Sequence, residues 1–445
     1  MRNAITWSAS PPTLASPLER NLAAACLALL LALNIGLISW KIFGVPVRGL
    51  LAVGMLGAVL VVYPDRFTRA LSRFAPVLWL AGGLALLGTI VSLVNGTGMD
   101  VIVKAVSEVH LQIAITVLVV VVLAEIAGMK AAVLVFAGVV GASIFIALLQ
   151  MLDVDSAWNL REALGRFQRE DALELATLQK GRPLGIAYSP IQFSTHACLA
   201  FAVYAAARER GQRFWHDRVN ADLMILFALG ALCVAAFISG TRSPLLGAAL
   251  FFLVYAARRP GSWLLLLIAL GGAALVLVGP ILLDAFQSAQ PRIVRTDDNS
   301  ATGRGSLIAM GILLFTDNPL GYGFGFSPTD HWPKFWQELY TLQNPSVLKD
   351  TQLHNYILNM INTYGIGLLL AAPVAYSLLM RARTVIIFYI PYIIHIMFHN
   401  FGPYWNDTPF WFTVAALAAP LLATGQGSVD SPPQVDDKTG GYALR

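Results

Sequence analysis

The sequence predicts an all-α polytopic membrane protein with about twelve transmembrane helices. The chain of 445 residues is 57% hydrophobic and only 12% charged, whereas soluble domains carry about 25% charged residues. Apolar stretches of membrane-spanning length recur from residue 21 to residue 424, with no gap that would hold a soluble domain. We therefore expect one integral membrane domain over residues 1–424, followed by a polar, disordered tail over residues 425–445.

The expected spans follow one another along the chain. They cover residues 21–40, 47–64, 76–94, 109–127, 131–151, 189–207, 221–239, 244–257, 262–283, 353–379, 384–400 and 409–424. The first apolar run is as long as a full crossing and lacks a small-residue cleavage site, so it is interpreted as a retained helix and not as a signal peptide.

Positive charge gives the expected orientation. Short basic loops all fall on one side if the spans alternate, and this side is cytoplasmic by the positive-inside rule. These loops contain Arg66, Arg69 and Arg73, residues 208–218, Arg258 and Arg259, and Arg381 and Arg383. Both termini join the same side. The formal charge of +5 is dispersed over these loops, which favours a topological role over nucleic-acid binding.

The opposite face receives the longest connections. Two segments, residues 153–190 and 284–352, and three short turns, residues 41–46, 95–106 and 402–408, lie there. Long loops are exempt from the positive-inside count, so their arginines do not contradict the orientation. The first long segment has a helical period of apolar residues and predicts an amphipathic helix on the membrane surface.

Four polar motifs converge on this outer face. They are GRPLG with Arg182, SGTRS with Arg242, TGRGS…NPLGYGFG with Arg304, Gly321, Gly323 and Gly325, and HN with His354 and Asn355. Polar groups beside a bilayer are costly, so such a concentration indicates a functional site.

The arginines suggest an anionic ligand. A tight turn between two spans holds Arg242 near the hydrocarbon boundary, and several guanidinium groups on one face suit a pyrophosphate. Arg48, at the outer mouth of the second span, is a further candidate phosphate contact. For Arg182 and Arg48 the alternative is an arginine that extends its side chain to lipid headgroups.

The glycine-dense loop is the second candidate for ligand contact. Gly321, Gly323 and Gly325 let the backbone turn sharply and approach a ligand closely. The alternative is a loop that merely crosses the face. The motif follows no strand and opens no dinucleotide-binding unit, so a nucleotide site is rejected.

The tenth span begins with His354, a candidate base or phosphate-binding donor. Asn355, Asn359 and Asn362 form a polar stripe at helical spacing, which faces either a cavity or a neighbouring helix through hydrogen bonds. No cofactor is expected. His395 and His399 have i, i+4 spacing but no third ligand accompanies them, so no metal site is expected either. The cysteines, Cys26, Cys198 and Cys233, lie in apolar segments and suggest packing residues.

The ordered set of motifs resembles the O-antigen ligase/polymerase superfamily. The resemblance covers residues 181–370 and rests on R-x-x-G before a span, SGTRS after the next, an arginine followed by NPLGYGFG, and HN followed by nine residues and GIG. The chain departs from the family pattern at Leu307, where an aromatic residue is frequent, and at Leu368, where Gly, Thr or Tyr is frequent.

The resemblance implies a metal-independent membrane glycosyltransferase of the glycosyltransferase-C type. It implies transfer of a polysaccharide from undecaprenyl diphosphate to a hydroxyl of lipid A-core on the periplasmic face of a bacterial inner membrane, in lipopolysaccharide biosynthesis. Arg182 and Arg242 match the arginines associated with the diphosphate, His354 matches the family histidine, and Arg304 matches the arginine before the glycine loop.

Two alternatives stay open. A polymerase that extends the repeat-unit chain would share nearly every motif with a ligase. A flippase for lipid-linked oligosaccharides, or another transporter, would also need many spans, but it should carry ionisable groups at the bilayer midplane and related halves, and the sequence has neither.

Overall fold

A computed structural model describes the protein over residues 15–38, 40–43, 45–165, 167, 182–209, 220–258, 299–342, 344–349, 351–381, 383–399 and 407–423. These residues are mostly helical. The one sheet among them is a minimal antiparallel hairpin of β1 (Lys41–Ile42) and β2 (Val45–Pro46). The predicted all-α class is confirmed for the part of the chain that is described.

The helices have the following bounds: α1 (Pro17–Gly36), α2 (Val47–Val62), α3 (Pro64–Val94), α4 (Met99–Ala105), α5 (Gln112–Ala127), α6 (Met129–Met151), α7 (Asp155–Gly165), α9 (Pro190–Glu209), α10 (Ala221–Ile238), α11 (Arg242–Arg258), α14 (Asn299–Asp317), α15 (Trp336–Leu339), α16 (Tyr356–Tyr364), α17 (Ala372–Arg381), α18 (Ile390–Met397) and α19 (Thr408–Ala423). A π-helical segment, Val106–Leu111, joins α4 to α5, and short 3₁₀ segments cover Pro328–Asp330, Trp332–Phe335, Pro345–Lys349, Gly365–Ala371 and Ile386–Tyr389.

Six of the described helices are long and apolar enough to cross a membrane, and two shorter apolar helices, Val47–Val62 and Ile386–Met397, accompany them. The six are Pro17–Gly36, Pro64–Val94, Met99–Ala127, Met129–Met151, Ala221–Ile238 and Tyr356–Ser377. This composition fits a polytopic membrane protein. The count of twelve is not confirmed, and the predicted span over residues 262–283 and the tail from residue 425 lie outside the described residues.

The basic segment before the third span is helical and not a loop, so that prediction was wrong. Pro64 occupies the first turn of α3, a position where proline is preorganised for a helix. Arg69 and Arg73, one turn apart, both pair with Glu125 of α5, at 3.3 and 3.9 Å. The paired carboxylate stabilises these charges on the helix surface, so the helix continues through them.

One other predicted boundary is wrong, and one predicted span changes its helix type midway. The turn expected over residues 95–106 ends early, because α4 begins at Met99 and continues through the π-helical segment into α5. The tenth predicted span, residues 353–379, corresponds to the apolar helix Tyr356–Ser377, but its α-helical hydrogen bonding changes to a 3₁₀ segment at Gly365, where φ is +61°. A side chain at Gly365 would overlap the backbone of Leu320, so the close approach of the glycine loop breaks this helix.

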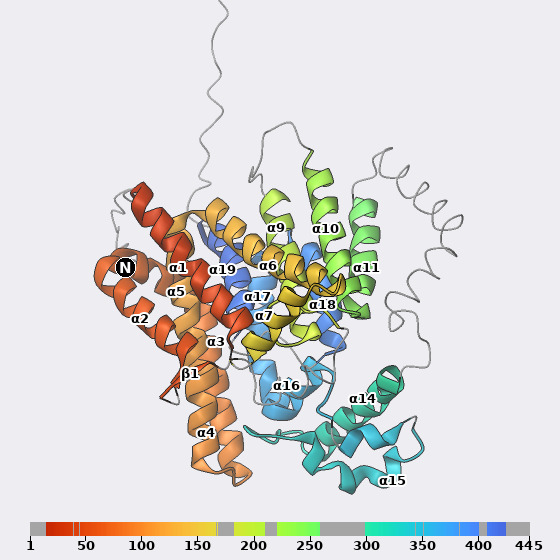
Figure 1. The fold of residues 1–445 in the computed structure, drawn as a ribbon. Helices are drawn as coiled ribbons and strands as arrows, with labels where there is room; N and C mark the ends of the chain where they lie inside the picture. Colours follow the sequence, from red (N-terminus) through yellow and green to blue (C-terminus); the bar gives the residue numbers. More distant parts are fainter. Residues whose placement is uncertain are drawn as a thin grey trace, which may run out of the picture.

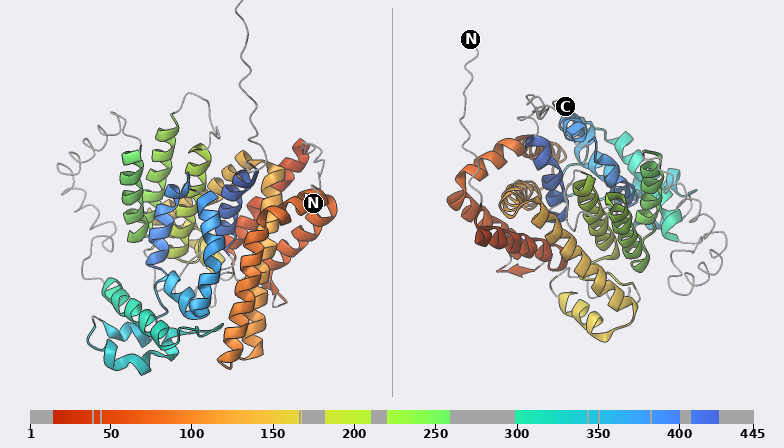
Figure 2. Two further views of the ribbon diagram at one scale, coloured as in Figure 1. Left: turned by 180° about the vertical axis from the view of Figure 1, so that it is seen from behind. Right: turned by 90° about the horizontal axis from the view of Figure 1, so that it is seen from above.

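Helices that are distant in sequence form one bundle. Figure 2 shows the N-terminal helices α1 to α3 on one side and α10 and α11 on the other. Between them, α6 and α19 each contact both α1 and α9, and α11 packs along α18. The elements α4, α14, α15 and α16 lie together at one end of the molecule (Figure 1). In the first long segment, the described residues 155–165 form the helix α7, and most of the predicted amphipathic helix, residues 159–179, lies outside the described residues.

Candidate active site

The turn that carries Arg182 is fixed by a buried glutamine. Gln150, at the end of α6, is 2% exposed. Its Oε1 accepts hydrogen bonds from the backbone N–H groups of Leu184 and Gly185, both at 3.0 Å, and its Nε2 donates to the Gly185 carbonyl oxygen at 3.2 Å. A side chain thus satisfies backbone groups that have no helical partner, and it holds the turn against α6.

Gly185 explains the spacing of the first motif. Its φ of +60° lies in the left-handed region, and any side chain there would overlap the backbone oxygen of Ser143. The hydroxyl of Ser143 also accepts the N–H of Ile186 at 3.2 Å. Only glycine fits at this position, so Gly185 sets the place of Arg182 three residues earlier.

Arg182 reaches the tight turn between α10 and α11. Its Nε and one terminal nitrogen both donate to the carbonyl oxygen of Ser239, at 3.2 and 2.9 Å. The turn continues through Gly240, with φ of +65°, and Arg242 opens α11. The first two arginine motifs of the sequence are therefore joined in space, while their role in a single site stays a prediction.

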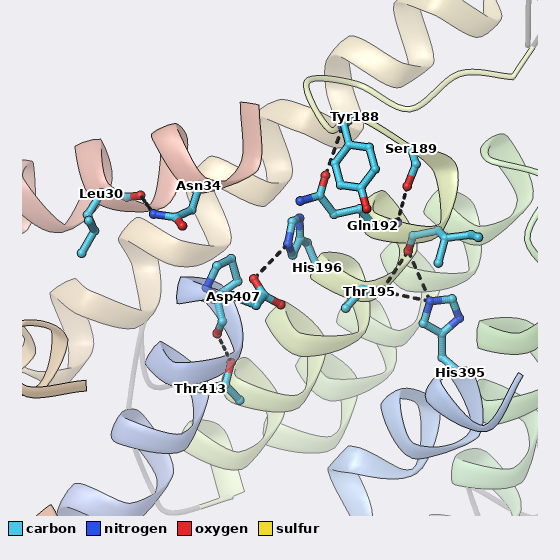
Figure 3. Close-up of polar contacts among 12 residues, drawn as sticks. Leu30, Asn34, Tyr188, Ser189, Gln192, Thr195, His196, His395, Asp407 and Thr413 are labelled. Atoms are coloured by element: carbon cyan, nitrogen blue, oxygen red, sulfur yellow. Dashed lines mark hydrogen bonds and ion pairs between the residues drawn. The ribbon is translucent and has the colours of Figure 1, made fainter. Parts of the chain in front are cut away.

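Two histidines of the C-terminal part join the same turn. The hydroxyl of Ser243 lies 2.9 Å from Nδ1 of His395 and 3.1 Å from Nε2 of His399. His395 Nε2 lies 3.0 Å from the hydroxyl of Thr195 and 3.2 Å from the carbonyl oxygen of Ile191. Figure 3 shows Thr195 of α9 directed toward His395 of α18.

The hydrogen-bond partners fix the protons of this network. Thr195 donates its proton to Ile191 at 2.9 Å, so only acceptors face His395 Nε2, and this nitrogen must carry the proton. His395 Nδ1 then accepts from Ser243, whose oxygen accepts in turn from His399 Nε2. The remaining nitrogen of His399, Nδ1, is buried without a hydrogen-bond partner among the described residues.

The third and fourth motifs meet beside these histidines. Arg304 of α14 lies over the ring of Phe398, with 5.8 Å from its guanidinium carbon to the ring centroid. Its charge acts on His354, His395 and His399, and the charge of Arg182 also acts on His399. The four sequence motifs therefore converge on the pair His395 and His399.

His354 is oriented by the backbone. It lies just before the apolar helix Tyr356–Ser377, and its Nδ1 lies 2.9 Å from the carbonyl oxygen of Gln352. A carbonyl only accepts, so Nδ1–H donates and the neutral ring keeps its lone pair on Nε2. Burial lowers the pKa of His354 and the charge of Arg304 lowers it further, while the hydrogen bond to Gln352 opposes this. The ring is therefore a neutral acceptor at pH 7.

The asparagines of the fourth motif hold helices in place. Asn355 caps α16, because its Oδ1 accepts the N–H of Leu358 at 3.0 Å. Asn362 is fully buried and donates to the carbonyl oxygens of Gly311, at 2.9 Å, and Leu358. The predicted polar stripe thus includes a hydrogen bond between helices at Asn362. Substrate contact by Asn355 stays a prediction.

The glycine loop connects three helices. Tyr322 N–H and Gly323 N–H donate to the carbonyl oxygens of Asn362 and Thr363 of α16, at 2.8 and 2.9 Å, and Phe324 N–H donates to the hydroxyl of Ser92 of α3 at 2.7 Å. The glycines Gly321, Gly323 and Gly325 have φ of +90°, +83° and +75°. Close packing against α16, α3 and α4 accounts for them, and substrate contact by these three stays a prediction.

Arg48 lies beside carboxylates. Asp407 and Glu108 act on its charge, and Asp407 also pairs with His196 of α9, with 3.5 Å between His196 Nε2 and the carboxylate. Figure 3 shows His196 and Asp407 on the side of α9 opposite His395. Ionisable groups buried in a membrane protein are costly unless paired, and the negative charge of Asp407 favours the charged form of Arg48. A role of Arg48 as a phosphate contact stays a prediction.

Sequence reasoning missed several of these residues. His395 and His399 were considered only as metal ligands, and Ser243, Gln150, His196 and Asp407 were assigned no role. The i, i+4 histidine spacing on an apolar helix was the one available signal, because hydrogen-bond partners 152 and 156 residues away in sequence leave no local pattern.

The comparison with known families gives one match. Residues 226–372 match a family model described as O-antigen ligase. This range includes Arg242, Arg304, the glycine loop and His354, while Arg182 lies before it. No curated protein matches the chain. The match supports a function of the O-antigen ligase/polymerase type and confirms the resemblance of the motifs: residues 226–372 are similar to the O-antigen ligase family.

Proposed function

We propose that the protein is an O-antigen ligase. In this reaction a polysaccharide passes from undecaprenyl diphosphate to a hydroxyl of lipid A-core on the periplasmic face of the bacterial inner membrane. The bond between the anomeric carbon of the sugar and the phosphate oxygen breaks, and a bond from that carbon to the acceptor oxygen forms. The electron pair leaves with undecaprenyl diphosphate, and the acceptor proton must pass to a base.

The orientation of His354 is the observation that carries this proposal. Its Nδ1–H is held by the Gln352 carbonyl oxygen, which leaves Nε2 to accept the acceptor's proton. The lowered pKa keeps that nitrogen unprotonated near neutral pH. The second role that the sequence left open for His354 is phosphate binding. That role would need a proton on Nε2, so that this nitrogen donates a hydrogen bond to the phosphate.

The arginines supply the charge stabilisation in the proposed reaction. Negative charge grows on the departing phosphate, and guanidinium groups fixed before the reaction stabilise that charge more in the transition state than in the ground state. Arg182 is fixed by two hydrogen bonds to Ser239, and Arg304 lies over the ring of Phe398, the residue before His399. With Arg242, they form the diphosphate site that we propose to work without a metal.

The test uses the purified protein in nanodiscs with an undecaprenyl-diphosphate-linked glycan, lipid A-core and EDTA. Wild type is compared with the variants Arg242→Ala, Arg304→Gln and His354→Ala, and with the control variant Glu338→Gln, which alters an exposed carboxylate on α15. Transfer to lipid A-core is expected in wild type and the control and lost in the other three.

The products separate the competing functions. Longer lipid-linked chains without lipid A-core product would assign the polymerase reaction instead. No transfer in a folded preparation would overturn the enzyme proposal and favour a transporter of lipid-linked oligosaccharides. Transfer that requires an added divalent cation would overturn the metal-independent mechanism.

A further inference from the structure

An open pocket of about 360 Å³ lies at the end of the molecule that carries α4 and α14. It is formed where the glycine loop and the 3₁₀ segment after it meet the turn between α3 and α4. Its lining includes Tyr322, Phe326, Ser327, Asp330 and His331. The volume lies within the range of about 300 to 1,000 Å³ that is typical of small-molecule sites.

Three rings group in the lining of this pocket. Tyr322 and Phe326 stack with centroids 4.9 Å apart and an interplanar angle of 22°, and His331 lies 5.8 Å from Phe326 and 4.6 Å from Tyr322. The Tyr322 hydroxyl is held by Asp317 at 3.1 Å. Its ring is therefore fixed before any ligand arrives, and aromatic faces of this kind pack against the apolar C–H face of a pyranose ring.

A carboxylate without an internal partner accompanies the rings. Asp330 is exposed, and no hydrogen bond or ion pair involves its side chain among the described residues. The neighbouring Asp317, by contrast, is bonded to Tyr322 and paired with Lys334, and its pKa is lowered, first by the hydrogen bond from Lys334. Asp330 is thus available to accept hydrogen bonds from ligand hydroxyls, and its charge disfavours an anionic ligand.

The pocket is connected to the candidate active site through Gln352. The Nε2 of Gln352 donates to the hydroxyl of Ser327, in the pocket lining, at 3.3 Å, and its carbonyl oxygen accepts the proton of His354 Nδ1 at 2.9 Å. A single residue therefore contacts both the pocket and the proposed base.

We propose that this pocket is a saccharide subsite that binds a neutral pyranose unit of the glycan substrate. Stacked rings with a free carboxylate and polar side chains at the rim match a ligand with one apolar face and several hydroxyl donors. The assignment of this sugar to a transferred or accepting glycan rests on the proposed function, whereas binding of the neutral pyranose is a property of the pocket itself.

The first experiment measures binding without any transfer. Saturation-transfer NMR is recorded on the nanodisc-embedded protein with methyl α-glucopyranoside, methyl α-galactopyranoside and methyl α-mannopyranoside, and with methyl glucuronide as the anionic comparator. Wild type is compared with Asp330→Asn, with Phe326→Leu, which keeps an apolar side chain but removes the ring, and with the control Glu338→Gln, which alters an exposed carboxylate outside the pocket.

Wild type and the control are expected to bind at least one neutral pyranoside, and Asp330→Asn to bind it about 10-fold more weakly, as for a lost charged hydrogen bond. In Phe326→Leu, most of the saturation transferred to the protons of the sugar ring is expected to be lost. The proposal is overturned if no neutral pyranoside receives saturation from wild type, or if Asp330→Asn and Phe326→Leu bind the pyranoside as strongly as wild type does. Glucuronide binding as strong as that of the neutral sugars would also overturn it.

A second experiment identifies the source of the sugar. In the transfer assay, a rise of about 10-fold in KM for the lipid-linked donor in Asp330→Asn, with kcat retained, assigns the subsite to the transferred glycan. The same rise for lipid A-core assigns it to the acceptor. Unchanged KM values for both would overturn the substrate assignment. Pyranoside binding without any transfer in wild type would contradict the proposed function alone.

Discussion

Replacing Ser243 with alanine tests the histidine network. The Ser243 hydroxyl is the partner of both His395 Nδ1 and His399 Nε2, at 2.9 and 3.1 Å, and all three residues are at most 6% exposed. Alanine leaves two buried nitrogen atoms without a partner. Each such atom costs about 1–3 kcal/mol, so the free energy of unfolding should fall by about 2–6 kcal/mol.

The assay is a titration with SDS of the protein in mixed micelles, followed by circular dichroism. Ser243→Thr, which keeps the hydroxyl, should lose less stability than Ser243→Ala. Ser72→Ala is the matched control, because the Ser72 hydroxyl is exposed and bonds only the carbonyl of Arg69 in its own helix; its effect should stay within about 0.5 kcal/mol. An unfolding free energy for Ser243→Ala equal to that of the control would refute the network.

Three further predictions concern the candidate site. Arg182→Lys keeps the positive charge but cannot make the two parallel hydrogen bonds to the Ser239 carbonyl oxygen, so the kcat of transfer should fall about 10-fold or more. An unchanged kcat would contradict a role of the preorganised arginine. Gly185→Ala places a side chain against the backbone oxygen of Ser143 at a positive φ, so it should abolish transfer and lower the free energy of unfolding by about 3 kcal/mol. In the control Gly230→Ala the new side chain has open space, so transfer and unfolding free energy should stay nearly unchanged. The pKa of His354 is lowered, so the pH profile of transfer should fall on the acid side with a midpoint below about 6.5. The unfolded chain binds this proton more readily, so His354 also makes stability decrease as pH falls below about 6.5; an acid limb above that value would argue against His354 as the base.

The sequence alone determined the class of this protein and the order of its motifs. Long apolar runs can bury their backbone polar groups in a bilayer only as helices, so composition and length predicted the spans. Most described helices begin and end within a few residues of the predicted limits. The failures occur at Pro64–Arg73, where paired charges extend a helix, and at Met99, where a helix begins within the expected turn. At Gly365 a distant loop interrupts the α-helical part of a predicted span. Local patterns carry no information about such partners.

The tertiary structure decided which polar residues meet. From sequence, His395 and His399 resembled half of a metal site; in the structure Ser243 and Thr195 hold them beside the arginines. These contacts join helices far apart in the chain. The physical reason is that a hydrophobic pattern fixes where a helix lies along the sequence, while buried hydrogen bonds select its neighbours and its rotation, because each polar group inside the bundle must find a partner there.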